Sequence, residues 1–488
     1  MKPSLKNPAR FHALIAGLGL ALAGRAPAQT FTNLHNFTGV NDGVGPDGGL
    51  ILSGSTLFGT AENGGSGGSG TVFALNTNGS GYTNLHNFTN NDGAQPTGRL
   101  ILSGNNLYGT ATYGGSSDYG TVFAVSTNGT SFTNMHSFTG GSAGGLPMGG
   151  LVLWGATLFG TAADQLGHSV NSYNPDSGTV FAINTDGTSF TNLYSFSPET
   201  TDSSTGLYTN CDGYSPQAGL ILSGTNLYGM TYSGGTGGWG TVFAVGTDGM
   251  GFTNLHSFTN GNDGAYPQGG LILSGNTLYG TASQGGSSHS GTVFAVNTDG
   301  TGFTILHSFT ALNFSAGVTN SDGATPFAGL ILSGDILYGV ASQGGSAGSG
   351  TVFALNTNGT FFTVLYNFTA LSPSFPELGT NSDGALPTAG LILSDNTLYG
   401  TTGSGGIAGH GTIFGLSLPV PPQLSITLSG TNVVLKWTNT VFPFTLQSTT
   451  NLSPTSWSAV SPSPVVINGQ NTVTNPITGT QQFYQLSQ

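Results

Sequence analysis

The chain has 488 residues, of which only 5% are charged and 83 are glycine. Its 19 acidic residues outnumber its 6 basic ones, which excludes binding to nucleic acids or anionic membranes by counterion release. Apolar clusters nevertheless recur along the chain, and disordered chains of similar polarity lack them. The composition therefore predicts a folded, turn-rich, all-β protein.

The first 28 residues have the layout of a secretory signal peptide. Lys2, Lys6 and Arg10 form a basic region, the apolar run FHALIAGLGLALAG follows, and residues 26–28 supply an A-x-A cleavage site. A retained membrane anchor is the alternative, but the run is short for a span, and no other segment is long enough. We expect export and cleavage, which leave two cations against 19 acidic residues, a net charge of −17.

Seven similar units follow one another over residues 29–418, at intervals of 50 to 62 residues. Each carries a segment like FTNLHNF, then GLILSG, LYGTA, a Gly-Gly loop and GTVFAV. Four short β-rich runs separated by turn residues are typical of a four-stranded antiparallel sheet. The FTNLHNF-like segments start at Phe31, Tyr82, Phe132, Phe190, Phe252, Phe303 and Phe362.

Pairs of Asn or Asp with Gly separate GTVFAV-like runs from the next FTNLHNF-like run. Because Gly adopts positive φ freely, and Asn and Asp do so more readily than most residues, these pairs fit tight hairpins. The pairs are Asn78-Gly79, Asn128-Gly129, Asp186-Gly187, Asp248-Gly249, Asp299-Gly300 and Asn358-Gly359.

Runs such as LILS and TVFAV are apolar at successive positions, so we expect both faces of each sheet to be buried. Helix signals are almost absent after residue 28, so other sheets must supply the cover. A parallel β-helix has shorter coils, and an open row of sheets leaves two uncovered end faces. We therefore predict a closed, seven-bladed β-propeller over residues 29–418. In it, residues 31–37 complete the last blade beside residues 412–415.

The units resemble the kelch repeat and, more closely, the GloVer (Gloeo/Verruco) tandem repeat of secreted bacterial proteins. The signature of the latter stands here as Leu107-Tyr108-Gly109-Thr110, Gly114-Gly115 and Gly120-Thr121-Val122-Phe123, and it recurs over about residues 31–417. The resemblance implies export and a location at the cell surface. It implies no catalytic activity and supplies no catalytic residues.

Residues 419–488 depart from the repeat pattern. Pro419, Pro421 and Pro422 predict a stiff linker. Six short β-rich runs then predict a small β-sandwich of the fibronectin III or immunoglobulin type. The end of the chain does not match the PEP-CTERM sorting signal of some GloVer proteins, so we expect another sorting or an adhesive role.

The large insertions lie in two kinds of connection, from the outer strand to the next inner strand and from the second strand to the third. In the predicted strand order both kinds emerge at the same end of the sheets, which we call the loop face. The opposite end carries mainly short hairpins. Because loops on a rigid scaffold commonly carry function, we expect a binding site on the loop face.

Six outer-to-inner loops contain the pattern D-G-x-x-P, while Ala143 takes the Asp position in the third loop. A ring of calcium sites is one interpretation, and hydrogen bonding to the loop backbone is the other. Calcium takes six to eight oxygens, so one carboxylate in each loop favours the second, and we expect no metal or cofactor. The aspartates are Asp42, Asp92, Asp212, Asp263, Asp322 and Asp383.

A histidine recurs at one position of the FTNLHNF-like segments, where Tyr194 and Tyr366 replace it in two units. Interchange of His with Tyr indicates packing or hydrogen bonding rather than metal ligation. The histidines are His35, His86, His136, His256 and His307.

Aromatic and polar residues of the loop face are candidates for binding a glycan, because aromatic rings stack on sugars. The alternative is that these rings fill the top layer of the propeller. The candidates are Tyr113, Tyr119, Asp164, His168, Tyr173, Trp239 and Tyr266.

Three functions remain open from the sequence. The favoured one is an exported, non-enzymatic protein that binds a glycan or a surface protein. The second is a carbohydrate-active hydrolase or lyase that uses paired loop carboxylates such as Asp164 and Asp176. The third is a structural surface-layer component without a ligand. No nucleophile motif in a strand-turn-helix context supports a serine hydrolase.

Overall fold

The computed structural model describes residues 29–163, 177–201, 208–372, 379–419, 422–438, 444–450, 457–477 and 482–487. The predicted signal segment, residues 1–28, lies outside them. Phe31–Leu418 forms one compact unit, and the chain from Pro419 onward belongs to a second. The protein is all-β, and no helix in its described part is long and apolar enough to cross a membrane.

Strands of Phe31–Leu418 form seven four-stranded antiparallel sheets in the described part of this unit, and six of them use four consecutive strands. The first two are β2 (Ile51–Ser53), β3 (Thr56–Ala61), β4 (Thr71–Asn76) and β5 (Thr83–Asn87), then β6 (Ile101–Ser103), β7 (Asn106–Ala111), β8 (Thr121–Ser126) and β9 (Phe132–Ser137). The next two are β10 (Val152–Trp154), β11 (Thr157–Ala162), β12 (Thr179–Asn184) and β13 (Thr191–Ser195), then β16 (Ile221–Ser223), β17 (Asn226–Thr231), β18 (Thr241–Gly246) and β19 (Thr253–Ser257). The last two are β20 (Ile272–Ser274), β21 (Thr277–Ala282), β22 (Thr292–Asn297) and β23 (Thr304–Ser308), then β24 (Ile331–Ser333), β25 (Ile336–Ala341), β26 (Thr351–Asn356) and β27 (Phe362–Asn367).

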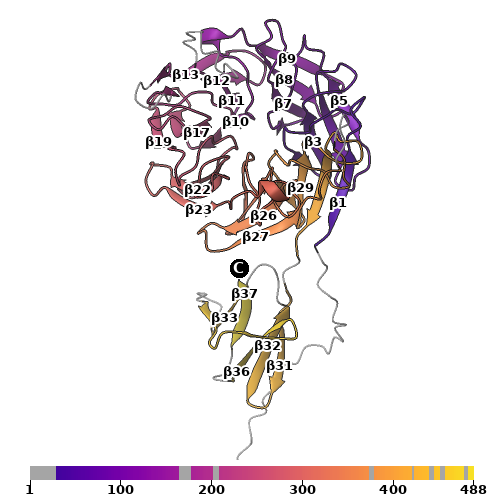
Figure 1. Cartoon of the computed structure of the whole chain (residues 1–488), viewed down its shortest axis with the longest axis vertical. Helices are drawn as coiled ribbons and strands as arrows, with labels where there is room; N and C mark the ends of the chain where they lie inside the picture. Colours follow the sequence, from indigo (N-terminus) through magenta and orange to yellow (C-terminus); the bar gives the residue numbers. More distant parts are fainter. Residues whose placement is uncertain are drawn as a thin grey trace, which may run out of the picture. The chain divides into compact units, whose positions relative to one another are not determined.

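The seventh sheet joins the two ends of the unit. It contains β28 (Ile392–Ser394), β29 (Thr397–Thr402) and β30 (Thr412–Ser417), and its fourth strand is β1 (Phe31–Asn36). In the antiparallel pair of β1 with β30, Phe31 lies opposite Leu416 and Asn36 lies opposite Thr412. The sheets of the unit follow one another around a common centre (Figure 1).

The loop face carries the remaining short elements. A 3-10 helix, η1 (Gly141–Ala143), lies between β9 and β10, and a second, η2 (Phe314–Ala316), lies between β23 and β24. A small hairpin of β14 (Thr200–Thr201) and β15 (Tyr208–Thr209) extends the connection from β13 to β16.

The recurring Gly of LYGTA makes room for the recurring Phe of GTVFAV. In the first sheet Gly59 lies opposite Phe73. A Cβ added to Gly59 would lie 2.6 Å from Phe73 Cζ, so only glycine lets the ring cross the neighbouring strand. The second and third strands are buried on both faces, as expected. The first strands are shorter and only half-buried, in contrast to the prediction for LILS, because they form the inner edge of the sheets.

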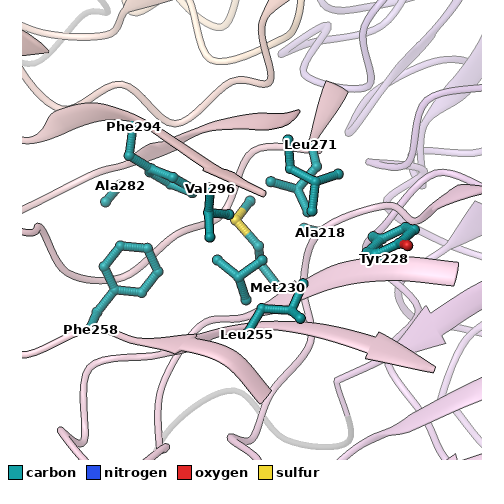
Figure 2. Close-up of a cluster of buried hydrophobic side chains, with 11 residues drawn as sticks. Ala218, Tyr228, Met230, Leu255, Phe258, Leu271, Ala282, Phe294 and Val296 are labelled. Atoms are coloured by element: carbon teal, nitrogen blue, oxygen red, sulfur yellow. The ribbon is translucent and has the colours of Figure 1, made fainter. Parts of the chain in front are cut away.

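The core of the unit lies between neighbouring sheets. Figure 2 shows one such cluster, where Met230 of β17 and Leu255 of β19 meet Phe294 and Val296 of β22. Another cluster joins the first sheet to the last through Phe73 and Ile413, among others. Burying a side chain of this size contributes about 1.5–3 kcal/mol, so each sheet depends on both neighbours.

The C-terminal unit has two sheets. One contains β31 (Ser425–Ser429), β32 (Asn432–Thr438), β36 (Gln470–Pro476) and β35 (Val465–Ile467), and the other contains β34 (Ser458–Ala459), β33 (Thr445–Thr449) and β37 (Phe483–Ser487). The buried hydrophobic side chains in the described part of these sheets are Leu435, Trp437, Leu446 and Val473. None of the six β-rich runs predicted from the sequence covers β36. The turn before it, Asn468-Gly469, has positive φ at both residues, the conformation of a tight hairpin.

Candidate functional site

The six aspartates of the D-G-x-x-P pattern stabilise the outer-to-inner loops of the loop face by hydrogen bonds. Each carboxylate accepts a hydrogen bond from the backbone N–H of the Thr or Ser that follows the outer strand, as in Thr38 to Asp42 (3.0 Å) and Ser197 to Asp212 (2.9 Å). The hydroxyl of the same Thr or Ser donates to the same carboxylate. The carboxylates therefore act as loop caps, which is the structural interpretation of the D-G-x-x-P pattern.

The recurring histidines and tyrosines are the second partners of these aspartates. His35 Nε2 lies 3.2 Å from Asp42 Oδ2, and His86 Nε2 lies 3.0 Å from Asp92 Oδ2. Where Tyr replaces His, the phenol donates instead, as Tyr194 does to Asp212 at 2.7 Å. Burial lowers the pKa of His35 and His86, and the adjacent carboxylates only partly offset it. These side chains are committed to loop structure rather than to metal ligation.

The third loop shows what happens without the carboxylate. Ala143 stands at the Asp position. In the described part of the chain, His136 Nε2 and Thr179 Oγ1 are buried there without a hydrogen-bond partner. In the other sheets the equivalent Thr donates to the loop backbone, as Thr71 Oγ1 does to Asp42 O at 3.3 Å.

The same His and Tyr rings link neighbouring sheets. Each stacks on the first aromatic residue of the following unit, with ring centroids 3.6 to 4.3 Å apart and planes within 13° of parallel. The series returns to its start, because Tyr366 stacks on Phe31 at 4.3 Å. The other pairs are His35–Tyr82, His86–Phe132, His136–Phe190, Tyr194–Phe252, His256–Phe303 and His307–Phe362.

Two predicted binding residues, Trp239 and Tyr266, lie together on the loop face. Their rings meet edge to face at 5.0 Å, and Tyr232 stacks on Tyr266 at 4.6 Å. Trp239 also packs against the core cluster between the fourth and fifth sheets. These rings are half-buried, so a large part of their surface serves packing.

A third predicted residue, Tyr113, lines a cleft of about 400 Å³ between the loops of the first two sheets. The cleft is polar. The backbone groups of Asn90 and Gln95 are hydrogen-bonded, as in Gln95 N–H to Ser69 O at 3.0 Å. The structure shows no hydrogen bond of their side-chain amides to the residues it describes. The other polar residues of the cleft are Asn63, Ser69 and Asp118.

Three residues of the cleft have positive φ. Asn90, Gln95 and Asp118 have φ values of 49°, 53° and 63°, a region that residues other than glycine rarely adopt. The residues equivalent to Gln95 adopt the same conformation in other loops, as Ser215 (56°) and Thr325 (58°) do, so it belongs to the repeated loop fold.

Of the remaining predicted residues, the structure describes only Tyr119. Tyr119 is exposed and lies over Gly140, where an added Cβ would meet its ring at 2.7 Å. Asp164, His168, Tyr173 and Asp176 lie outside the described residues. Within the part of the chain that the structure describes, no three His, Cys, Asp or Glu side chains form a group that could hold a metal ion.

The family model of the Gloeobacter/Verrucomicrobia repeat matches residues 17–172, 165–319 and 310–434, which covers most of the chain. The chain belongs to this family. The GloVer resemblance inferred from LYGT, GG and GTVF is thereby confirmed. No curated protein matches the sequence.

Several solved structures are similar to this GloVer protein at low identity. They include an oligogalacturonate lyase in complex with manganese (11% identity, 80% of this chain, 93% of that chain, TM-score 0.45). A GH74 enzyme of Niastella koreensis has 14% identity over 84% of this chain and 59% of that chain, with a TM-score of 0.48. A chain of the nidogen/laminin complex has 15% identity over 66% of this chain and 94% of that chain, with a TM-score of 0.37.

One pair of neighbouring carboxyl groups in the GloVer unit, Asp47 and Glu62, was not predicted from the sequence. Asp47 and Glu62 lie near each other beside Gly45, and Thr388 Oγ1, from the loop before the last sheet, donates to Asp47. Burial raises the pKa of both carboxyl groups, and the charge of Asp47 raises that of Glu62 further. No motif joins these three residues, because the contact depends on the last repeat meeting the first.

The geometry of this pair favours a structural role. Glycosidases that work with two carboxyl groups hold them about 5 Å or more apart, so that a sugar or a water fits between them. The Asp47 carboxyl group is already bonded to Thr388 from the far end of the unit, which favours a structural role. The raised pKa of Glu62 keeps this group protonated to higher pH, which lowers the electrostatic cost of two nearby acidic groups.

Proposed function

We propose that Phe31–Leu418 is a closed, seven-bladed β-propeller. The pairing of β1 with β30 supports closure, because the first strand of the unit supplies the fourth strand of its last sheet. The seven aromatic stacks support it independently, since Tyr366 of the last complete repeat stacks on Phe31. The bond from Thr388 to Asp47 adds a polar contact between the loops that lead into the last and the first sheets.

We propose further that the protein is exported and binds a glycan on the loop face without catalysing a reaction. The observation that carries this is the cleft that Tyr113 lines together with Asn90 and Gln95, whose side-chain amides form no hydrogen bond to the described residues. Sugars are bound by this combination, since a ring covers their C–H face and amides hydrogen-bond their hydroxyl groups.

Purified protein lacking residues 1–28 tests this on a panel of polysaccharides, with retention and product release both measured. Tyr113→Gln should reduce retention about tenfold or more, because stacking of one ring contributes about 1–2 kcal/mol. The repeat units supply the choice of residue, because Gln284 and Gln343 occupy the equivalent position in two other sheets. Gln343→Ala, at that position in a sheet far from the cleft, is the matched control and should bind as the parent does.

The panel also separates the alternatives. Release of shorter saccharides would replace binding by a hydrolase or lyase activity, and the loop that holds Asp164 and Asp176 would be the first place to mutate. Absence of both retention and release, with ordered self-assembly, would favour a structural surface component. N-terminal sequencing of protein recovered outside the cell tests export, and Gln29 is the expected first residue.

A further inference from the structure

Seven equivalent residues form the innermost contacts of the GloVer unit. They stand two positions before the first strand of each sheet, and each neighbours the next. The carbonyl oxygen of the neighbouring position lies 2.9 Å from an ideal Cβ at Gly150, 3.0 Å at Gly219 and 3.7 Å at Gly49. At Gly49 that oxygen belongs to Gly390, so the contacts run from the last sheet back to the first.

Six of these seven residues are glycine, and the exception is Arg99. Its Cγ lies 3.7 Å from the Cβ position of Gly49, and its Nε donates to Leu50 O at 3.1 Å. The side chain therefore crosses from the second sheet to the inner edge of the first. Arg99 is exposed to solvent despite this central position.

The charge of Arg99 is unusual in this unit. It is the one Lys or Arg in the sequence of Phe31–Leu418, against 19 acidic residues, a net charge of −18. Among the described residues, no carboxylate forms an ion pair with it. Glycine serves at the same position in the other six units, so the fold does not require a cation there.

We propose that Arg99 is an anion-binding residue that takes one carboxylate group of a ligand at the inner edge of the sheets, on the loop-face side. Nε is already bonded to Leu50 O, and the two terminal amino groups remain to bind a carboxylate. A planar guanidinium binds this group with two parallel hydrogen bonds. The surrounding net charge of −18 repels polyanions, so a ligand with a single carboxylate fits best.

This site is separate from the proposed glycan cleft, whose lining does not include Arg99. Each proposal can therefore fail without the other. Tyr113→Gln should leave the Arg99 site unchanged, and substitutions of Arg99 should leave retention on neutral polysaccharides unchanged.

Glucuronate is a suitable probe, with glucose as its neutral counterpart, because the two differ by one carboxylate. Binding to the protein lacking residues 1–28 is measured by calorimetry and by the rise in melting temperature. One charged contact predicts half-saturation on the order of 1–10 mM. Arg99→Gly should abolish the response to glucuronate, and Arg99→Lys should weaken it about tenfold, since an ammonium lacks the paired geometry.

Without ligand, Arg99→Gly should melt at the same temperature as the parent or higher, because glycine is the residue of the other six units. This separates loss of binding from loss of folding, and Arg99→Lys tests the site even if the glycine variant fails to fold. An equal response of parent and Arg99→Gly to glucuronate would overturn the proposal. So would an equal response of the parent to glucose, or no response of the parent up to 100 mM.

Discussion

At the scale of single residues, the repeats act as internal controls. Six loops keep an aspartate beside a His or Tyr, and one loop has lost it. The loops Thr38–Pro46 and Thr139–Pro147 have the same length, yet only the first has a carboxylate to accept the bonds described above. Ala143 therefore leaves His136 without the carboxylate that Asp42 provides in the equivalent loop of the first repeat.

Ala143→Asp should stabilise the protein. The new carboxylate accepts hydrogen bonds from His136 and from the backbone of Thr139, and such charge-assisted bonds contribute about 1.5–3 kcal/mol. Urea unfolding measures the gain. The matched reverse change, Asp42→Ala, should cost a similar amount by leaving His35 buried without its partner. Equal stability of both variants and the parent would show that these carboxylates are dispensable.

At the scale of strands and loops, the contacts of β1 join the start of the unit to its last repeats. Phe31 of β1 stacks on Tyr366 and also on Phe414, with centroids 5.4 Å apart in the second pair. β1 is held by these contacts, by its ladder with β30 and by side-chain contacts such as the stack of His35 on Tyr82, and no hairpin connects it to the sheet it completes.

Phe31→Ala should lower the free energy of unfolding by about 3 kcal/mol, the usual cost of truncating a packed Phe. Removal of residues 31–37 should cost more, because an unpaired edge is then exposed on β30. Removal of Gln29 and Thr30, which precede the strand, is the control. A deletion of residues 31–37 that melts at the parent temperature would contradict the role of β1.

Glu62→Gln should stabilise the protein at alkaline pH. The pKa of Glu62 is raised in the folded state, so its contribution to stability is complete below the unfolded value near 4.5 and is lost as the pH rises through the folded value. Glutamine keeps an N–H donor for Asp47 at every pH. We expect a gain of about 1 kcal/mol at pH 8 and none at pH 4. A gain of equal size at both pH values would contradict the raised pKa of Glu62 in the folded state.

At the scale of the whole molecule, the unit is a set of near-identical sheets whose order in space follows their order in the chain, except at one junction. At that junction, between β1 and the last sheet, only the chain connection differs. The aromatic stacks of β1 and its pairing with β30 are like those of the outer strands in the other sheets. Moving the strand in the sequence should therefore be tolerated.

A circular permutant tests this. In it, residues 31–37 follow Ser417 through Thr-Asn-Gly-Thr-Ser, the hairpin residues 127–131 of the second repeat, and the chain starts before β2. We expect it to fold and to melt at the parent temperature or above, because the hairpin replaces a costly long-range closure by a local one. Calorimetry measures the transition. A permutant with a broad, non-cooperative transition would mean that the free N-terminal strand has another role.

Sequence reasoning worked where the signals are local and repeated. Asx-Gly pairs located hairpins, and the fixed spacing of LYGT and GTVF predicted the four-stranded sheets. It failed where a contact joins distant loops. Asp47 meets Thr388 from the far end of the unit, and neither residue stands in a motif. Tyr113 is the one cleft residue that was predicted from the sequence, because the positive φ of Asn90 and Asp118 cannot be read from the amino-acid composition.

The arrangement of β1 also sets a timetable. Synthesis proceeds from the N-terminus, so this strand emerges first and must wait for β30, the last strand of the unit, before it is paired. During that interval the backbone N–H and C=O groups of β1 have no partner strand, and an unpaired strand is prone to aggregation. The pairing of β1 with β30 can therefore form only after the whole unit has been synthesised.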